Sequence, residues 1–491
     1  MREVKLSELL NNVSVIQTLG NAEERVIKRI SADSRNVDEH TVFIAVSGFR
    51  FDAHDFVQEV VSKNAAAVVI EKNIFPDELF TRTETVKILV KDSRKALAEF
   101  SNAFYGFPSR KLKLTGITGT KGKTTTAFLL KGIFDYAGIK SGLIGTVKNI
   151  IGEKETRAKL TTPESYELNE MFSEMLEQGV THCVMEVSSH ALSLKRVHGL
   201  DFDFAGFTNL ASDHLDFYQT RLNYFLAKKI LFDELKPEAV AVVNINDEHG
   251  EKIVEHSKAR VVAYGEKNES DFRIENIEFD LTGTRFDLVF NNKTRRITTT
   301  AVGAFNAYNA TLAFAIAYEH GIDEEKIIEG IARAPRVPGR FEVIEKNGKI
   351  AIIDYAHTAG SLEKTLIALR EIVKNKKKIY TVFGAGGDRD RSKRPKMGAV
   401  AEKYSDKIFV TSDNPRTENP EKIIKNILEG IKSKDVYVNP DREEAIAEAI
   451  SQAGKDAVVL IAGKGHEDYQ EINGVRHHFS DKEIAEKYLN E

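Results

Sequence analysis

Runs of apolar residues alternate with amphipathic stretches along most of the chain. In the first hundred residues, apolar runs predict strands at 41–46, 65–70 and 86–90, and helical spacing predicts helices near 55–63 and 93–105. Strands that alternate with helices are typical of open, largely parallel sheets. The chain is therefore expected to begin with a small α/β domain.

The same alternation continues through the centre of the chain. An alternating run that begins at Leu112 predicts another strand, and apolar runs at 182–187, 202–208 and 239–245 predict three more. A β-hairpin is expected within 285–300, where two alternating runs flank a pair of asparagines. A central sheet with a small hairpin element follows from this pattern.

Two segments rich in turn residues divide the chain. Phe107-Pro108-Ser109 precedes the central strands, and 334–340 contains two prolines and a glycine. Beyond the second segment, strands are expected at 350–354, 378–383, 407–411 and 456–461, and helices at 361–374, 421–432 and 443–450. Because 491 residues are too many for one core, we expect three α/β domains, at 1–107, 108–335 and 336–491.

Composition narrows the function classes. The net charge of −4 argues against a nucleic-acid-binding surface. The single cysteine, Cys183, lies in an apolar run and excludes an internal disulfide. No apolar run is long enough to cross a bilayer, and the N-terminus lacks the apolar core of a secretion signal. We therefore expect a cytoplasmic protein that does not insert into membranes.

The strand that begins at Leu112 leads into a glycine-rich loop and then a helix, the order that a phosphate-binding loop requires. Glycines allow backbone N–H groups to curl around phosphate oxygens, and the helix start adds partial positive charge. Lys123 can reach the outer phosphates, and the Thr124 hydroxyl can hold Mg²⁺. We expect ATP to bind through Gly119, Thr120, Lys121, Gly122, Lys123, Thr124 and Thr125.

The loop departs from the usual pattern in one position. A glycine is expected five residues before Gly122, and Ile117 stands there, so the loop is a variant with glycines at 116, 119 and 122. A tight turn with an incidental Gly-Lys-Thr is the alternative interpretation. The order of strand, loop and helix favours the phosphate loop.

Polar residues follow the next central strands. An acidic residue such as Glu186, at the end of a strand near a phosphate loop, is the usual second support for Mg²⁺. His214 follows the third strand, where a metal or phosphate contact is favoured over a plain loop histidine. Lys228, on a predicted helix, would by itself be interpreted as a surface lysine. Asn309 is compatible with either a turn cap or a contact with a base.

The strands of the last domain also end in polar clusters. Any one cluster could be a charged surface loop, but the carboxyl ends of parallel strands meet at one edge of a sheet. Four clusters therefore predict a ligand crevice. They are Asp354–His357, Gly384–Arg391, Asp413–Arg416 and Gly463–Glu467.

Taken together, these motifs resemble the Mur ligases of bacterial cell-wall synthesis, over essentially the whole chain. The occurrence of so many motifs in one order is specific to this family, whereas the phosphate loop alone occurs in many families. In chain order they are Asp33-Ser34-Arg35, GTKGKTT at 119–125, TTPE at 161–164, EVSSHAL at 186–192, FTNL and DHLD at 207–216, Ala227-Lys228, VPGRFE at 337–342, DYAHT at 354–358, FGAGGDRDRSKRP at 383–395, DNPR at 413–416 and AGKGHEDYQ at 462–470.

The resemblance implies a three-domain fold. A UDP-sugar-binding α/β domain would precede a central P-loop domain with a parallel sheet and a C-terminal, Rossmann-like domain that binds an amino acid. It also implies an ATP-dependent ligase of peptidoglycan precursor synthesis. This ligase would join UDP-N-acetylmuramoyl-L-alanyl-D-glutamate (the UDP-muramoyl dipeptide) to a diamino acid through an acyl phosphate, with release of ADP and phosphate. We expect a monomer.

The resemblance also assigns roles to residues. Lys123, Glu186, His214 and a carbamylated Lys228 would be catalytic, with Thr124, Glu186, His214 and Lys228 as supports for Mg²⁺. Carbamylation turns a lysine ammonium into an anion that can bind a cation. ATP would also contact Asn309 and Arg340, and the UDP-sugar substrate would contact Ser34, Thr161, Thr162, Ser188 and Arg196.

The DNPR motif resembles that of family members that use meso-diaminopimelate, which has a carboxylate and an ammonium at its far end. Arg416 could pair with that carboxylate through two hydrogen bonds. L-Lysine lacks this carboxylate and would leave a guanidinium unpaired, which corresponds to discrimination on the order of 10⁴. The implied binding residues are Arg389, Asp413, Asn414, Pro415, Arg416, Gly463 and Glu467.

Three alternatives remain open at this stage. A ligase of the same kind could accept L-lysine, alone or as well. A P-loop ATPase without ligase activity belongs to another class, and the second crevice argues against it. Folylpolyglutamate synthases share the ATP-ligase layout, but the DNPR and EVSSHAL motifs do not indicate them.

Overall fold

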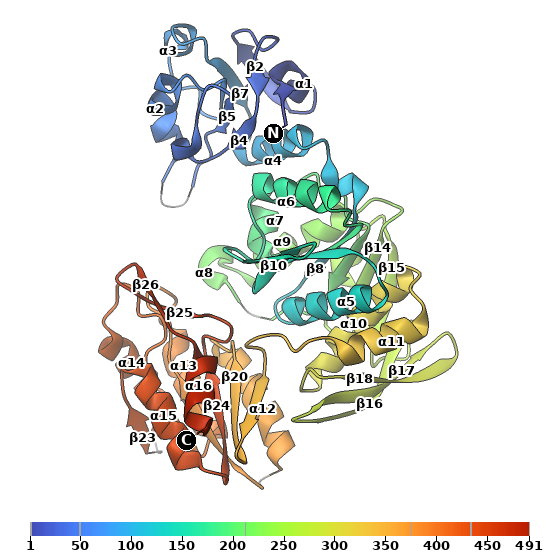
Figure 1. The fold of residues 1–491 in the computed structure, drawn as a ribbon, viewed down its shortest axis with the longest axis vertical. Coiled ribbons are helices and arrows are strands. Elements are labelled where there is room, and N and C mark those ends of the chain that lie inside the picture. The colour runs from blue at the N-terminus through green and yellow to red at the C-terminus, as the bar shows by residue number, and fades with distance from the viewer. Residues whose placement is uncertain (1, 49–50, 212, 375, 433–434, 491) are drawn as a thin grey trace. The chain divides into compact units, whose positions relative to one another are not determined.

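The computed structural model describes residues 2–48, 51–211, 213–374, 376–432 and 435–490 (Figure 1). The chain divides into two compact units. Met1–Phe272 and Leu312–Ile327 form the first unit, and Arg273–Thr311 and Ile328–Glu491 form the second.

The first unit begins with a five-stranded sheet. Its strand order is β2 (Val15–Leu19), β7 (Val86–Val90), β6 (Ala67–Ile70), β5 (Thr41–Ile44) and β4 (Arg29–Ser31). Four strands are parallel, and only β2 runs antiparallel, to β7. The strands β1 (Val4–Lys5) and β3 (Val26–Ile27) pair antiparallel as a separate two-stranded sheet.

Helices cover both faces of this sheet, because alternate residues of a strand point to opposite sides. Val42 and Ile44 lie in one apolar cluster with residues of α1 (Leu6–Leu10) and α4 (Ser93–Phe104). Phe43 lies in the other cluster, with residues of α2 (Val57–Ser62) and α3 (Asp77–Thr81). The predicted opening α/β unit has this layered arrangement.

The central sheet of the first unit is built around β8 (Lys113–Thr118). Six of its strands are parallel neighbours, and β10 and β11 extend one edge as an antiparallel hairpin. The strand order in this unit is β11 (Lys154–Arg157), β10 (Lys148–Ile151), β9 (Ser141–Ile144), β12 (His182–Glu186), β8, β13 (Phe204–Phe207), β14 (Val240–Asn244) and β15 (Arg260–Gly265).

The central strands are rich in apolar residues, as strands that are covered on both faces of a sheet must be. The strand β8 pairs with β12 and β13 on its two sides, and Leu114 and Ile117 are fully buried. One large cluster joins Leu114, Phe172 and Phe232 beneath the sheet. The helices that connect the strands are α5 (Lys123–Tyr136), α6 (Ser165–Glu177), α7 (Ser189–Ser193), α8 (Leu215–Tyr218) and α9 (Arg221–Asp233).

The second unit contains the predicted hairpin and a second α/β sheet. The strands β16 (Phe272–Asp280), β17 (Gly283–Phe290) and β18 (Lys293–Thr299) pair antiparallel, with a register shift between Glu275 and Glu278. Helices α10 (Phe305–Glu319) and α11 (Glu324–Arg333) follow, and the segment Leu312–Ile327 that they share belongs to the first unit.

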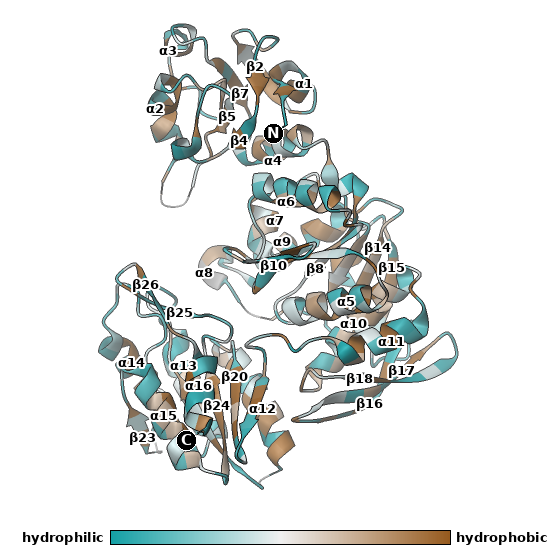
Figure 2. Cartoon of the chain, viewed as in Figure 1, coloured by the Kyte–Doolittle hydropathy of each residue, from teal (hydrophilic) through white to brown (hydrophobic). Residues whose placement is uncertain are grey.

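The C-terminal sheet is parallel except for its first strand. Its order is β19 (Glu342–Lys346), β20 (Lys349–Asp354), β24 (Ala457–Ala462), β21 (Lys378–Phe383), β22 (Lys407–Val410) and β23 (Val436–Val438). Figure 2 shows its strands as strongly apolar. One face packs on α12 (Ala359–Val373), α13 (Lys393–Tyr404) and α14 (Pro420–Leu428), and the other on α15 (Arg442–Ala453) and α16 (Asp481–Asn490).

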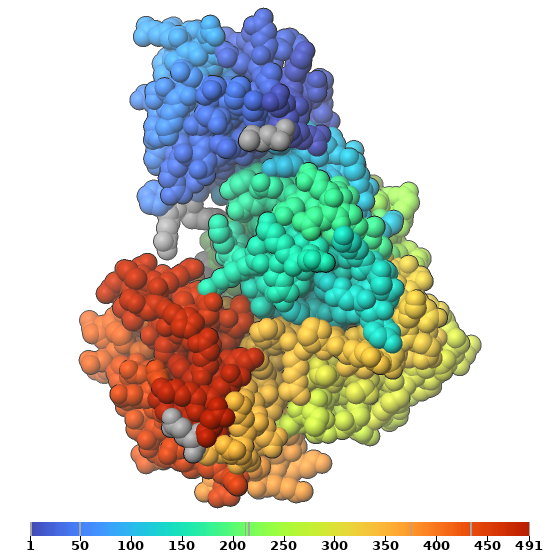
Figure 3. All heavy atoms as spheres, viewed as in Figure 1, coloured from blue at the N-terminus to red at the C-terminus, as the bar shows by residue number. Residues whose placement is uncertain are grey.

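A small hairpin, β25 (Tyr469–Ile472) and β26 (Val475–His478), lies apart from this sheet. Its second strand is exposed along its whole length. In Figure 3 the last part of the chain, in red, forms surface on the second unit. Among the described residues, no helix is long and apolar enough to cross a membrane.

The predicted fold class is confirmed. The predicted strands, the hairpin within 285–300 and the second open sheet are all present, with ends shifted by up to a few residues. Elements outside the prediction include β9, the hairpin β10–β11, α13 and α16. The strand β11 has no buried residue, so it has no apolar alternation that a sequence pattern could reveal.

We predict that a partly buried histidine makes the first unit sensitive to acid. The His320 ring stacks on Phe204 with 3.8 Å between centroids, and its Nε2 lies 3.3 Å from Thr115 Oγ1. Burial, together with the nearby His182, lowers the pKa of His320 to about 3. Below pH 6.5, His320 is protonated in the unfolded chain but stays neutral in the folded protein. The free energy of unfolding therefore falls as the pH drops toward 3, by at most about 1.4 kcal/mol per pH unit.

Thermal unfolding at several pH values between 7 and 4 tests this prediction. His320→Gln should flatten the decline of Tm with acid, whereas the exposed His477→Gln should leave it unchanged. An equally steep decline in the His320→Gln protein would contradict the prediction.

Candidate active site

The phosphate loop lies between β8 and α5, as predicted. Gly119 and Gly122 have φ values of +144° and +94°, a region that favours glycine, and Gly122 is the N-cap of α5. Lys123 Nζ folds back over the loop and donates to the carbonyl oxygens of Gly119 (2.8 Å) and Thr120 (3.1 Å). The first N–H groups of α5 have no acceptor within the helix, so this end suits an anion.

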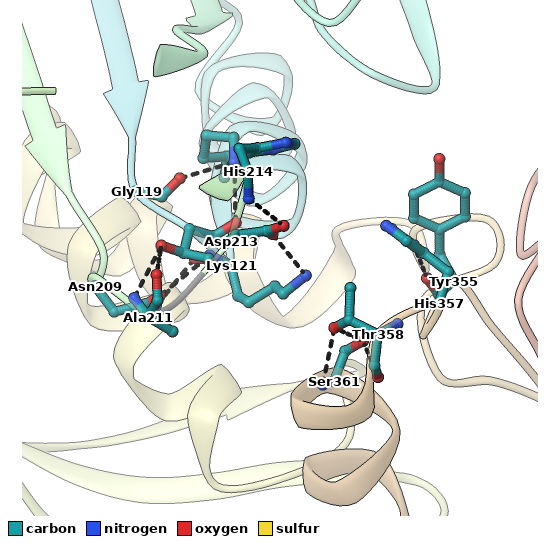
Figure 4. Close-up of polar contacts among 12 residues, drawn as sticks. Gly119, Lys121, Asn209, Ala211, Asp213, His214, Tyr355, His357, Thr358 and Ser361 are labelled. Atoms are coloured by element: carbon teal, nitrogen blue, oxygen red, sulfur yellow. Dashed lines mark hydrogen bonds and ion pairs between the residues drawn. The ribbon is translucent and has the colours of Figure 1, made fainter. Parts of the chain in front are cut away.

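The segment after β13 fixes the conformation of this loop. Asn209 receives hydrogen bonds from Lys121 N at Oδ1 (3.1 Å) and from Thr120 N at its carbonyl oxygen (2.8 Å). Thr208 Oγ1 donates to Lys121 O at 2.6 Å, and Ala211 N donates to Thr120 Oγ1 at 2.9 Å. Figure 4 shows Asn209 and Ala211 against Lys121. Sequence reasoning did not assign Thr208 or Asn209 to the ATP site, because their contacts cross about 90 residues.

Gly119 has no room for a side chain. A Cβ at this position would lie 1.9 Å from Thr208 Oγ1 and 3.1 Å from Asn209 N. The glycine is therefore required both by its φ and by the close approach of the segment after β13.

A cluster of oxygen atoms lies at the end of β12. The Glu186 side chain is buried, and its Oε2 accepts hydrogen bonds from the hydroxyls of Thr124 and Thr146, each at 3.0 Å. Its Oε1 accepts from Thr146 N at 2.8 Å. Glu186 and Thr124 were predicted to meet, and they do. Thr146 was missed, although the Gly145-Thr146 pair directly follows β9 and marks a strand end.

Lys228 is not a surface lysine. Its side chain is fully buried, and its Nζ donates to Gly119 O at 3.0 Å, the same oxygen that Lys123 Nζ contacts. Burial and the nearby Lys123 hold the pKa of Lys228 well below its usual range, while Asp213 acts in the opposite direction. The helix α9 therefore brings to the phosphate loop a buried amine whose charged form is disfavoured by burial.

His214 lies on the exposed side of the same region. Its φ is +53°, its N–H donates to Asp213 Oδ1 at 3.0 Å, and its ring is 4.8 Å from the His190 ring. Asp213 Oδ2 also lies 3.5 Å from Lys121 Nζ (Figure 4). Among the described residues, no group of three or more His, Cys, Asp or Glu side chains is arranged to hold a metal ion.

Four of the five predicted sugar-substrate residues gather next to Glu186. Thr162 Oγ1 donates to Glu186 O at 2.8 Å and accepts from Ser188 N at 3.1 Å. Arg196 Nη1 donates to Thr162 O at 3.1 Å, and Thr161 Oγ1 lies 3.1 Å from Thr146 Oγ1.

The fifth, Ser34, begins a short 3₁₀ turn after β4 in the opening α/β domain. Its carbonyl oxygen accepts from Lys63 Nζ at 2.8 Å. No contact joins it to the other four predicted residues in the described structure.

The two further predicted ATP residues belong to the second unit. Asn309 is buried in α10, and its Nδ2 donates to Asn306 Oδ1 at 2.8 Å. Arg340 follows the predicted linker, and its guanidinium lies over the Tyr355 ring at 4.5 Å. In the same region Thr358 caps α12 by a reciprocal bond pair with Ser361, which Figure 4 also draws.

The predicted amino-acid residues meet at the carboxyl end of the C-terminal sheet. Asn414 Nδ2 donates to Glu467 Oε2 at 2.8 Å, and a Cβ on Gly463 would lie 2.6 Å from Asp413 Oδ2. Asp413 and Asn414 are buried. Burial raises the pKa of Glu467, and Lys464 partly offsets this effect.

Arg416 lies at the edge of this group with a φ of +52°. Its Nη1 donates to Gly387 O at 2.7 Å, and its Nε lies 3.8 Å from Glu471 Oε2, so the guanidinium keeps further donors. Arg389 is exposed, and both arginines lie near Gly386, where an added Cβ would be 3.0 Å from Arg416 Nη1 and 3.8 Å from Arg389 Cγ. Pro415, between Asn414 and Arg416, is buried.

A buried ion pair next to this group of residues was not predicted. Arg442 and Asp481 are both fully buried and form two hydrogen bonds, at 2.7 and 2.8 Å. Arg442 also donates to Ser412 O and Ala462 O, at the ends of β22 and β24. Arg442 opens α15 after the N-cap Asp441, and its sequence context is that of an ordinary charged helix start.

The sequence matches three family domains. It matches the Mur ligase family catalytic domain over residues 26–105, the Mur ligase middle domain over 117–317, and the Mur ligase glutamate ligase domain over 339–465. These matches occur in the same order as the three predicted domains.

Named relatives match nearly full length. The UDP-N-acetylmuramoyl-L-alanyl-D-glutamate–2,6-diaminopimelate ligase 1 of Clostridium acetobutylicum is 41% identical, covering 99% of this chain and 100% of the relative. The corresponding ligase of Aquifex aeolicus is 42% identical over 94% of each chain.

Solved structures agree on the fold. A structure of UDP-N-acetylmuramoyl-L-alanyl-D-glutamate–2,6-diaminopimelate ligase matches with a TM-score of 0.70 and 30% identity, over 100% of this chain and 99% of that one. The MurF ligase of Thermotoga maritima in complex with ADP shares the fold at a TM-score of 0.63 and 21% identity, over 94% and 97% of the two chains. By full-length identity to these relatives and by its three matching domains, the chain belongs to the Mur ligase family.

Proposed function

We propose that this chain is the ATP-dependent amide ligase that joins meso-diaminopimelate to UDP-N-acetylmuramoyl-L-alanyl-D-glutamate in peptidoglycan precursor synthesis. The family and the names of its relatives support the ligase reaction. The observation that carries the choice of amino acid is the position of Arg416, on the same loop as Asn414, whose side chain is hydrogen-bonded to Glu467. We further propose that it acts as a monomer in the cytoplasm, which supplies its ATP.

We assign to each of three domains the principal contacts with one substrate. Residues 1–107 would hold the UDP-sugar, 108–335 the ATP, and 336–491 the amino acid. The cluster of Thr161, Thr162, Ser188 and Arg196 offers hydroxyl and guanidinium donors to the UDP-muramoyl dipeptide, and Ser34 would contribute from the first domain. Asn309 and Arg340 would complete the ATP contacts.

The chemistry requires activation of a carboxylate, which is a poor electrophile. Transfer of the γ-phosphoryl group of ATP to the substrate carboxylate gives an acyl phosphate and ADP. The amine of the amino acid then attacks the acyl carbon, and phosphate leaves. Positioning and charge stabilisation dominate such a transfer. Lys123 would move from the loop carbonyls to the outer phosphates, where its ammonium opposes the accumulating negative charge.

The oxygen cluster around Glu186 fits Mg²⁺, which prefers oxygen ligands and is usually bound by one or two carboxylates together with substrate phosphates. Thr124, Glu186, His214 and Lys228 would support the metal, either directly or through water. When bound, Mg²⁺ neutralises phosphate charge and draws electron density from the transferred group. The absence of a cluster of three acidic or histidine side chains in the described chain is compatible with a site that phosphate oxygens complete.

Carbamylation of Lys228 would supply a further anion. The reaction adds the neutral amine to CO₂, giving a carbamate and one released proton. Lys228 is buried, and its pKa is lowered by burial and by Lys123, which favours the neutral, nucleophilic amine. The Nζ atoms of Lys123 and Lys228 both contact Gly119 O, so two ammonium groups there would repel each other. A carbamate on Lys228 would replace this repulsion with an attraction to Lys123.

Arg416 generates a prediction about amino-acid specificity. In the enzyme with ATP and the UDP-muramoyl dipeptide, Arg416→Lys should raise the KM for meso-diaminopimelate about tenfold or more, because lysine cannot reproduce a two-bond contact with a carboxylate. The KM for ATP should stay within about twofold, a change of about 0.4 kcal/mol. Initial rates of ADP release measure both constants.

Arg333→Lys is the matched control, because Arg333 is an exposed residue of α11 paired with Glu329. The unsubstituted enzyme should prefer meso-diaminopimelate over L-lysine. Equal turnover with L-lysine would favour the broader ligase. A rate of ADP release that does not change when either amino acid is added would favour an ATPase without ligase activity.

Lys228 generates a second prediction. In ¹³C-bicarbonate, the protein should show a carbamate ¹³C NMR signal that is absent from Lys228→Arg. Lys229→Arg should keep the signal, because Lys229 forms an ion pair with Asp233 on its own helix. A signal that survives in Lys228→Arg, or is missing from the unsubstituted protein, would contradict the assignment.

A further inference from the structure

The hairpin β25–β26 is attached to the loop that carries Arg416. Arg416 N donates to Glu471 O at 2.9 Å, and Asn473 N donates to Arg416 O at 2.8 Å. Glu471 N donates to Asn414 Oδ1 at 2.9 Å. These bonds place the hairpin and the DNPR loop in one hydrogen-bonded unit.

Lys464 lies at the centre of this unit, and its side chain is fully buried. Its Nζ donates to Asn414 Oδ1 at 3.2 Å and to Tyr469 O, and lies 3.4 Å from Glu467 Oε2. The three donors of the ammonium therefore contact the loop, the hairpin and the acidic side chain in turn. No role for Lys464 follows from the proposed function.

We propose that Lys464 is a positioning residue for the amino-acid site: its ammonium fixes Asn414 and Glu467 in the arrangement that receives the ammonium end of the diamino acid. This inference rests on the proposed function. Lys464 acts through its two neighbours. Without its ammonium, Asn414 Oδ1 would keep the bond from Glu471 N, and Glu467 Oε2 would keep the bond from Asn414 Nδ2, but both would lose their contact with a buried cation.

Lys464 also bears on the ionisation of Glu467. A carboxylate must be ionised to attract an ammonium strongly. Burial and the neighbouring Asp413 raise the pKa of Glu467, whereas Lys464 and the Asn414 amide lower it. Arg442 and Tyr355 also interact electrostatically with Glu467. Without Lys464, Glu467 would therefore take up a proton at higher pH than it does in the intact site.

Lys464→Met tests the inference, because methionine keeps much of the apolar stem and removes the ammonium. The KM for meso-diaminopimelate should rise about tenfold or more, since hydrogen bonds to charged groups are lost. The KM values for ATP and the UDP-muramoyl dipeptide should stay within about twofold. The acid limb of kcat/KM for meso-diaminopimelate should move to higher pH, by about one unit.

Lys425→Met, at an exposed position of α14, is the control and should change none of these values. Lys464→Arg is the second variant, because it keeps a positive charge in a different shape. It should raise the KM for meso-diaminopimelate but leave the acid limb near its original pH. This variant also carries the test if Lys464→Met does not fold.

The outcomes separate the inference from the proposed function. An equal rise in all three KM values, an unmoved acid limb in Lys464→Met, or the same limb shift in Lys464→Arg would overturn the role of Lys464. Failure of the unsubstituted enzyme to turn over with meso-diaminopimelate would overturn the proposed function, and the inference with it.

Discussion

The hydrogen bonds between the segment after β13 and the phosphate loop are the contacts on which the ATP site depends. Thr208 and Asn209 hold the backbone of Lys121, and Gly119 faces Thr208 so closely that no side chain fits. This fixed loop brings Lys123 and Lys228 to one carbonyl oxygen and Thr124 to Glu186. The arrangement follows from parallel strands, whose carboxyl ends meet at one edge of the sheet.

The C-terminal sheet repeats this principle for a different ligand. Its strand ends carry Asp413, Asn414 and Gly463, and the buried Arg442–Asp481 pair joins the ends of β22 and β24 from below. Removing one partner of such a pair is costly, because it leaves an uncompensated buried charge. The polar groups at these strand ends are therefore supported by buried charges.

Sequence patterns predicted the elements with strong apolar alternation and the motifs at their ends. They did not single out Thr146, because β9 is a short strand with a weak pattern. They could not predict the contacts of Thr208 and Asn209, which join distant segments. Lys228 shows the limit most clearly. A lysine on an amphipathic helix is usually exposed, and only the resemblance to the Mur ligases gave Lys228 a catalytic role; its burial is known from the structure alone.

The central claim is that ATP activates a carboxylate, and the fate of one oxygen atom tests it most directly. The UDP-muramoyl dipeptide would be labelled with ¹⁸O in its reacting carboxylate and incubated with the enzyme, ATP and meso-diaminopimelate. An acyl phosphate predicts that each phosphate released carries one labelled oxygen, because the amine displaces phosphate together with a carboxylate oxygen. Unlabelled phosphate would mean that water attacked ATP, which would contradict the ligase mechanism.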